Sequence, residues 1–161
     1  MIRSGILMVL SFLFLAACSK DEAPDFCSDH AQFHAEHVDS NAVLSIVMTA
    51  DGRVDSEIRL PAATFGGDTT LAVLQDVSKV YALQTTVECG TAKSSLESLD
   101  GIVIGRYTSN CGADNKLSQV DVLLFDSLPE LSEVEVSVVT PVTQKQFAIN
   151  RQCESAIFRV E

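Results

Sequence analysis

The sequence predicts a mainly β protein, either an antiparallel β-sandwich or a related α+β sheet with one N-terminal helix packed on it. Residues 53–60 alternate between charged side chains and side chains that are apolar except for Ser56, which is the period of a strand with one face in the core. Further short runs with strand character follow at intervals of roughly ten residues, as in sandwiches. Before residue 42 the residues instead favour a helix.

The predicted helix covers residues 27–38, which follow Pro24 and stop before Asp39-Ser40-Asn41. Asp25 and Asp29 stand at its start, where negative charge suits the helix dipole. The first strand covers residues 42–49, and Asp51-Gly52 predicts a two-residue hairpin turn after it. The return strand would place one set of side chains in the core (Val54, Ser56, Ile58 and Leu60) and the other in water (Arg53, Asp55, Glu57 and Arg59).

Further strands are predicted at residues 102–109, 120–124, 133–138, 146–150 and 155–160. Residues 71–87 remain ambiguous, because their leucines fit a helix whereas their β-branched residues fit strands. The glycine-rich run at residues 66–70 carries no lysine, and we predict a loop there.

The first 17 residues have the features of an export signal: Arg3 precedes a run of apolar residues that is too short to cross a membrane. Leu15-Ala16-Ala17-Cys18 follows and resembles the lipobox of bacterial lipoproteins. This resemblance implies cleavage before Cys18 and attachment of a diacylglycerol, with acyl chains such as palmitate, to its thiol. Ser19 stands where an aspartate favours the inner membrane, so the resemblance implies the outer membrane and a domain that faces the periplasm.

The expected organisation is a signal peptide at residues 1–17, a lipidated tether at residues 18–25 and a single β-rich domain at residues 26–161. Loss of residues 1–17 removes one arginine and no acid, so the mature chain has 10 basic and 22 acidic residues and a formal charge of −12. Such a surface repels nucleic acid and anionic head groups. We therefore expect no nucleic-acid partner, and membrane attachment through the lipid anchor alone.

Four further cysteines predict two disulfides in an oxidising compartment. Sequence alone allows three connectivities. We favour Cys89–Cys111, because a predicted hairpin separates the two and each precedes a glycine, and this leaves Cys27–Cys153. The sequence contains no Cys-x-x-Cys motif, the pattern that would indicate redox or metal chemistry.

All three histidines, His30, His34 and His37, lie on one face of the predicted helix. Three interpretations remain open: they hydrogen-bond the sheet within the core, they form a pH-sensitive contact, or they bind metal. In the third interpretation, His30 and His34 at i and i+4 chelate one Zn²⁺ or Cu²⁺, and the remaining ligands come from elsewhere because His37 is too distant along the axis.

The sequence carries no nucleophile elbow and no phosphate-binding loop, and alanine replaces the glutamate of a zincin motif. A Ser-His-Asp triad is defined by geometry, so spacing leaves it open. We therefore expect a non-enzymatic, cofactor-free binding or scaffolding protein of the cell envelope with a protein partner there. The alternative is a metal-binding protein centred on His30 and His34.

Overall fold

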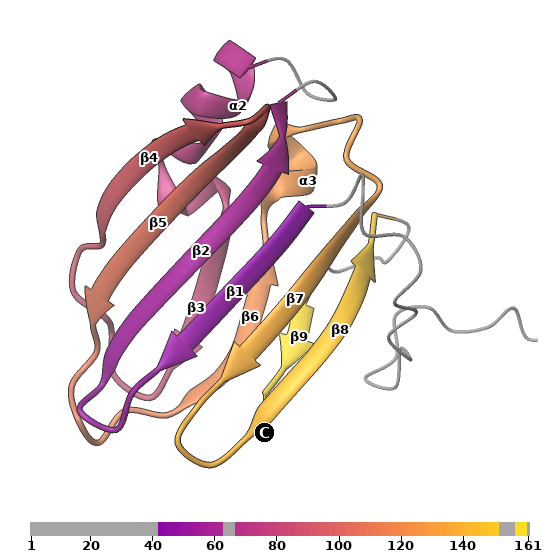
Figure 1. Ribbon diagram of the computed structural model, residues 1–161. Helices are drawn as coiled ribbons and strands as arrows, with labels where there is room; N and C mark the ends of the chain where they lie inside the picture. Colours follow the sequence, from indigo (N-terminus) through magenta and orange to yellow (C-terminus); the bar gives the residue numbers. More distant parts are fainter. Residues whose placement is uncertain (1–41, 63–66, 152–156, 161) are drawn as a thin grey trace, which may run out of the picture.

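The computed structural model describes residues 42–62, 67–151 and 157–160, which form two β-sheets with few helices (Figure 1). The mainly β prediction is confirmed. The predicted signal peptide, tether and N-terminal helix lie outside the described residues. In chain order the elements are β1 (Ala42–Met48), β2 (Arg53–Pro61), α2 (Gly67–Leu74), the 3-10 helix η1 (Val77–Lys79), β3 (Tyr81–Thr85), β4 (Lys93–Leu99), β5 (Ile102–Asn110), β6 (Leu117–Val122), α3 (Leu124–Ser127), β7 (Glu133–Val139), β8 (Gln144–Asn150) and β9 (Ile157–Arg159).

The larger sheet has six strands in the order β4-β5-β2-β1-β7-β8, and the smaller sheet has three in the order β3-β6-β9. Neighbouring strands are antiparallel, as predicted, except that β1 and β7 run parallel. The larger sheet is therefore mixed. The parallel pair joins two strands that are far apart in the chain, and hydrophobic alternation within each strand gives no information on such pairing.

The two sheets lie face to face across one apolar core, which fits the predicted sandwich (Figure 1). Between them, the hydroxyl oxygens of Ser56 on β2 and Tyr81 on β3 are 2.6 Å apart. The rings of Tyr81 and Tyr107 meet edge to face, with centroids 6.0 Å apart. The Tyr107 hydroxyl donates a hydrogen bond of 2.7 Å to the carbonyl of Leu74, which attaches the end of α2 to the same core.

The alternation predicted for residues 53–60 is confirmed: the side chains of Val54, Ser56, Ile58 and Leu60 are buried, and the intervening side chains face outward. β7 likewise buries Val134, Val136 and Val138. Full burial of one such aliphatic side chain contributes about 1.5–3 kcal/mol, so this pattern determines which face of each strand is inside.

The ambiguous stretch at residues 71–87 contains both kinds of structure, first a helix and then a strand. The prediction of a loop at residues 66–70 is wrong for residues 67–70, which begin α2; Gly66 lies outside the described residues. Asp68 suits the first turn of this helix, and Val73 and Leu74 bury its far end. The strand predicted at residues 120–124 ends at Val122, because Leu124 reaches the core from the short helix α3.

A hairpin was predicted between Cys89 and Cys111, but no bounds were predicted for its first strand, which is β4. Its sequence, KSSLESL, is largely exposed, so the hydrophobic alternation that identifies other strands is missing. A local signal was nevertheless present in Asp100-Gly101, which joins β4 to β5. Both residues have positive φ, 50° and 80°, as a two-residue type I′ hairpin turn requires.

The β1–β2 hairpin is confirmed, but its loop has three residues, 50–52, rather than two. Gly52 has a φ of 80° and donates to the Thr49 carbonyl at 2.9 Å, and Thr49 donates to the Arg53 carbonyl. Gly52 also lies against Gly112: a Cβ added to Gly52 would be 1.9 Å from the Gly112 carbonyl oxygen. Glycine is therefore required at position 52 both for backbone conformation and for space.

We predict that Gly52→Ala destabilises the protein by about 1–3 kcal/mol more than Gly101→Ala. Both glycines have a φ of 80°, so both variants incur the left-handed backbone cost of about 1–2 kcal/mol. Only position 52 adds a steric clash, since nothing lies within 4 Å of a Cβ at Gly101. Urea unfolding followed by far-ultraviolet circular dichroism measures both, and equal losses would contradict the close approach.

Candidate functional site

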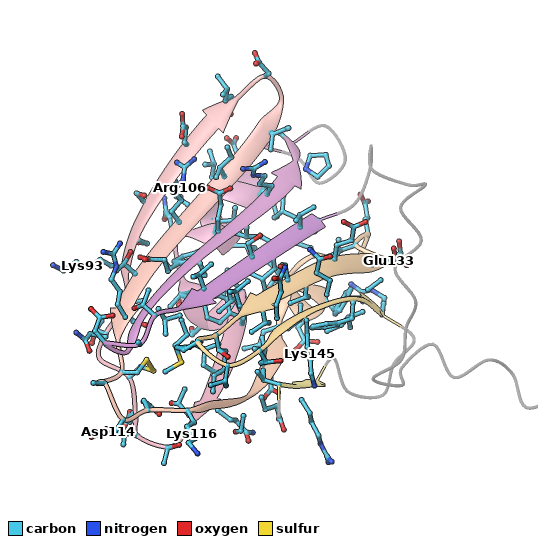
Figure 2. The ribbon with its side chains drawn as sticks, turned by 60° about the horizontal axis from the view of Figure 1, so that its bottom comes forward. Lys93, Arg106, Asp114, Lys116, Glu133 and Lys145 are labelled. Atoms are coloured by element: carbon cyan, nitrogen blue, oxygen red, sulfur yellow. A yellow bond between two sulfur atoms is a disulfide. The ribbon has the colours of Figure 1, made fainter. Side chains whose placement is uncertain are left out.

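The outward surface of the larger sheet carries a cluster of alternating charges, which we call the charged face. It consists of seven of the outward side chains of β2, β4 and β5, namely Arg53, Asp55, Glu57, Arg59, Glu97, Arg106 and Thr108. Strand alternation places these side chains together, because the neighbours of each residue along the strand point to the opposite face of the sheet. Figure 2 shows Arg106 on this face.

Glu57 is the centre of the charged face. One of its oxygens, Oε1, accepts a hydrogen bond of 2.7 Å from Arg59 Nε, and the other, Oε2, accepts one of 2.7 Å from Arg106 Nε. Arg106 then reaches Glu97 on the next strand, where Nη1 lies 2.7 Å from Oε2. The chain of charges forms because the register places Glu57 directly opposite Arg106 on β5.

A second, smaller group surrounds Asp55. The carboxylate is 2.8 Å from Arg53 Nε, and it accepts a hydrogen bond of 2.8 Å from the Thr108 hydroxyl. Thr108 stands opposite Asp55 in the same β2–β5 register. The two groups therefore occupy successive outward rows of the sheet, and each fixes its side chains across a strand boundary.

The ion pairs hold Glu57 in its charged form. Partial burial raises the pKa of its carboxyl, but the hydrogen bonds from Arg59 and Arg106 outweigh burial and keep the pKa below its ordinary value. The pKa of Arg106 is raised, chiefly by its bond to Glu97 and next by its bond to Glu57. A general acid or base needs a pKa near the working pH, so the state of Glu57 suits hydrogen bonding better than proton transfer.

A hollow of about 370 Å³ lies over this part of the sheet. Ser45 and Val47 of β1 form one side, and the side chains of Asp55, Glu57 and Arg106 form much of the rest. Val47 is 40% exposed although it is apolar. The hollow thus offers a small apolar surface beside charged groups whose positions are already fixed, which is an arrangement suited to binding a polar partner.

The charged face also differs from the chain as a whole in its charge. The full chain has a formal net charge of −11. On the charged face, by contrast, the three arginines equal the three carboxylates in number. A partner that meets this face therefore avoids much of the repulsion that an acidic protein presents elsewhere to negative groups.

Of the cysteines predicted to form disulfides, Cys89 and Cys111 are joined, which confirms the favoured pairing of these two. The bond connects the segment before β4 to the residue after β5. Asn115 closes the same end: its side-chain amide donates to the carbonyls of Val87 and Cys111 at 2.6 and 2.7 Å. The disulfide thus lies at the end of the strands that carry the charged face.

The other predicted site residues lie outside the described residues: Cys18, Cys27, His30, His34, His37 and Cys153. The lipidation site, the Cys27–Cys153 bond and the Zn²⁺ or Cu²⁺ site therefore stay predictions. Across residues 42–62, 67–151 and 157–160, no group of three His, Cys, Asp or Glu side chains is placed to hold a metal ion. Within those same ranges no helix has the length and apolar character needed to cross a membrane.

Sequence reasoning identified part of the charged face and missed the rest. Arg53, Asp55, Glu57 and Arg59 were assigned to the solvent side of β2, but Glu97, Arg106 and Thr108 were not singled out. Residues 102–109 were predicted as a strand, and their even-numbered members share one face. This alternation predicts that Arg106 and Thr108 lie on the same face of their strand. Only the order of the strands in the sheet shows that this strand lies beside β2.

We predict that Glu57→Gln lowers the free energy of unfolding at pH 7 by about 0.2–1 kcal/mol, the usual range for ion pairs near the surface. Because the folded-state pKa of Glu57 is depressed, its stabilisation is present above the unfolded-state pKa and is lost as the pH falls through the folded-state pKa. The difference between wild type and variant should therefore vanish in acid.

Urea unfolding at a series of pH values measures this difference. Glu130→Gln is the matched control, because Glu130 is exposed and forms no ion pair with another described residue. A Glu57→Gln effect that stays constant from pH 7 to strongly acidic conditions would argue against the ion pairs as its cause.

No protein-family model matches this chain, and no curated protein matches its sequence. The comparisons therefore supply no family, substrate or partner. The function proposed below rests on the residues of this chain and on their geometry.

Proposed function

We propose that the protein is a lipid-anchored component of the bacterial cell envelope whose β-rich domain binds or scaffolds another envelope component without catalysing a reaction. The anchor is Cys18 in the outer membrane, and the domain faces the periplasm. The partner, a protein of the envelope, meets the charged face.

Support for the anchor comes from the lipobox-like Leu15-Ala16-Ala17-Cys18 and from Ser19, which follows it. The charge of the chain supports the same conclusion. A mature protein with an excess of acidic residues has no electrostatic attraction to anionic head groups, so acyl chains must supply the binding energy, at about 0.8 kcal/mol per buried CH₂.

The observation that carries the binding role is the preorganised set of charges around Glu57. Two guanidinium groups and a second carboxylate are held in place by bonds of 2.7 Å across three strands. A partner that binds there orders few additional side chains, and ordering a long side chain costs about 0.5–1.5 kcal/mol. The adjacent hollow adds an apolar contact at Val47, on the β1 side of the same surface.

Two properties of this surface favour binding over catalysis. The carboxylate of Glu57 is neutralised by two arginines and its pKa lies below the ordinary value, so it is a poor proton donor or acceptor near neutral pH. The cluster also stands on the outer side of a sheet, where surrounding water weakens electrostatic effects on a reaction. Specific recognition needs neither a shifted pKa nor exclusion of water.

We predict that Cys18→Ser leaves the protein unlipidated, unprocessed by the lipoprotein peptidase and absent from the acylated membrane fraction. The reason is that the thiol is the acceptor of the diacylglycerol in the lipobox resemblance, and serine offers no thiol. Metabolic labelling with a fatty-acid analogue and separation of inner and outer membranes measure the result. Acylation of the variant, or wild-type protein free in the periplasm, would refute the anchor.

We predict that a photo-crosslinking amino acid at Val47 captures an envelope protein in intact cells, whereas the same amino acid at Val142 does not. Val47 lies in the hollow on the charged face, and Val142 lies beyond β7. Val142 is 92% exposed, against 40% for Val47, so random collision favours the control position.

Arg106→Glu provides the second arm of this experiment. It places a third carboxylate beside Glu57 and Glu97 and should reduce the Val47 crosslink strongly while the protein remains in the outer membrane. Equal capture at both valines, or capture unaffected by Arg106→Glu, would rule out the charged face as the binding surface.

A further inference from the structure

Strand β4 is the outer strand of the larger sheet, and in the described part of the chain its ladder partner is β5 alone. Its seven residues pair with β5 without a register shift, and it contains no proline. Proline, bulges and shortness are the usual devices that stop an edge strand from pairing with another chain. None of the three is present in β4, which lies along one margin of the sheet in Figure 1.

The backbone of β4 has a defined set of groups that point outward. Cys111 donates to Gly52 and Ala62 donates to Gly101, so the odd-numbered residues of β5 bond to β2. The backbone groups of the even-numbered residues of β5 therefore point toward β4. The carbonyl of Asn110, for example, accepts a hydrogen bond from Gly90, in the segment before β4. On β4, the partners of these even-numbered residues are the odd-numbered residues. It follows that the N–H and C=O groups of Ser94, Leu96 and Ser98 point away from the sheet.

We infer that β4 pairs in antiparallel orientation with β4 of a second copy of this chain, about a two-fold axis at Ser95. The two six-stranded sheets would become one continuous sheet, with both charged faces on the same side. Ser94 of each copy would exchange backbone hydrogen bonds with Leu96 of the other, which uses the outward groups of both strands.

Charge complementarity selects this register. With the axis at Ser95, Lys93 of one copy stands directly opposite Glu97 of the other, and the pair occurs twice. Lys93 forms no ion pair with another residue in the described ranges, and in Figure 2 it projects from the edge of the sheet. Glu97 is 49% exposed at its side chain and engages only Oε2 with Arg106, which leaves Oε1 for a second cation.

Moving the axis to Leu96 would remove this complementarity, because Lys93 would then stand opposite Leu99 and Glu97 opposite Ser95. A lysine on an edge strand ordinarily discourages pairing. Here the same strand supplies the opposite charge at the matching position. An unrelated strand has no reason to carry a glutamate at that position, so the arrangement favours a second copy as the occupant.

The remaining edges in the described residues are less suitable. β9 has three residues, and β3 has a register shift between Gln84 and Thr85. On the far margin of the larger sheet, Lys145 of β8 donates to the carbonyl of Arg159 on β9, so this edge is held against the smaller sheet. β4 is thus the edge that combines length, regular register and self-complementary charge.

Disulfide trapping tests the register directly in the full-length, membrane-anchored protein. Ser95→Cys places the two thiols opposite each other at a non-hydrogen-bonded pair, where Cα atoms are about 4.5 Å apart and a disulfide can form. Ser94→Cys is the matched control on the same strand, because its two copies would be diagonal and about 8 Å apart. After mild oxidation we expect about tenfold more covalent dimer from Ser95→Cys than from Ser94→Cys.

A charge exchange in the Ser95→Cys background provides the second test. Lys93→Glu sets glutamates opposite each other, and Glu97→Lys sets lysines opposite each other, so each variant alone should lose about tenfold in trapped dimer. Co-expression of the two, with different tags, should restore trapping between them, because each new lysine then faces a glutamate. Circular dichroism and intact Cys89–Cys111 bonds verify that each variant is folded.

Monomeric Ser95→Cys after oxidation, equal trapping of Ser94→Cys, or failure of the exchanged pair to restore the dimer would overturn the inference. So would trapping of Ser95→Cys to a different protein, which would mean that another chain occupies the edge. The Ser95→Cys and Ser94→Cys outcomes are independent of the Val47 crosslink, because neither serine belongs to the charged face as defined above, whereas Glu97 belongs to both surfaces.

Discussion

The contact between Gly52 and Gly112 is the constraint on which the charged face depends. It joins the start of β2 to the segment that follows β5, at a separation that excludes even one methyl group. Through the bond from Cys111 to Gly52 it fixes the β2–β5 register, and through the Cys89–Cys111 disulfide it reaches the segment before β4. A slip of one residue in that register would turn Arg106 away from Glu57 and bury its charge in the core. The electrostatic pattern of the surface therefore follows from a backbone contact at its end.

Three properties are proposed for the protein: a lipid anchor, a binding surface on the charged face, and a contact with a second copy at β4. The anchor depends on residues before the described fold, the binding surface on cross-strand ion pairs, and the contact between copies on backbone groups of a single strand. The charged face and the β4 edge share Glu97 but otherwise use different residues, so a partner on the charged face and a second copy at β4 can be bound together. Arg106 and Glu97 connect the two surfaces, because the same ion pair that closes the charged face also orients the glutamate at the edge.

Strands that bury one face were predictable because hydrophobic burial imposes a period of two, and β2 and β7 show it without interruption. β4 lacks that period, since only Leu96 among its residues reaches the core. The order of the strands lay beyond sequence reasoning, because the parallel β1–β7 pairing is decided by packing between distant segments. For the same reason the four residues of the charged face on β2 were recognisable, while Glu97, Arg106 and Thr108 on the neighbouring strands were not. The predicted histidine cluster and lipid anchor belong to residues before Ala42, which the described fold does not include.

The chain contains no tryptophan and only two tyrosines. Both of them, Tyr81 and Tyr107, lie in the layer where the two sheets meet, with their rings in contact. The near-ultraviolet spectrum therefore arises chiefly from this one junction, whereas the far-ultraviolet spectrum arises from the strands of both sheets. A state in which the sheets have separated but kept their strands would lose the first signal and retain the second. The protein thus carries an intrinsic optical probe of sheet-to-sheet packing that needs no label.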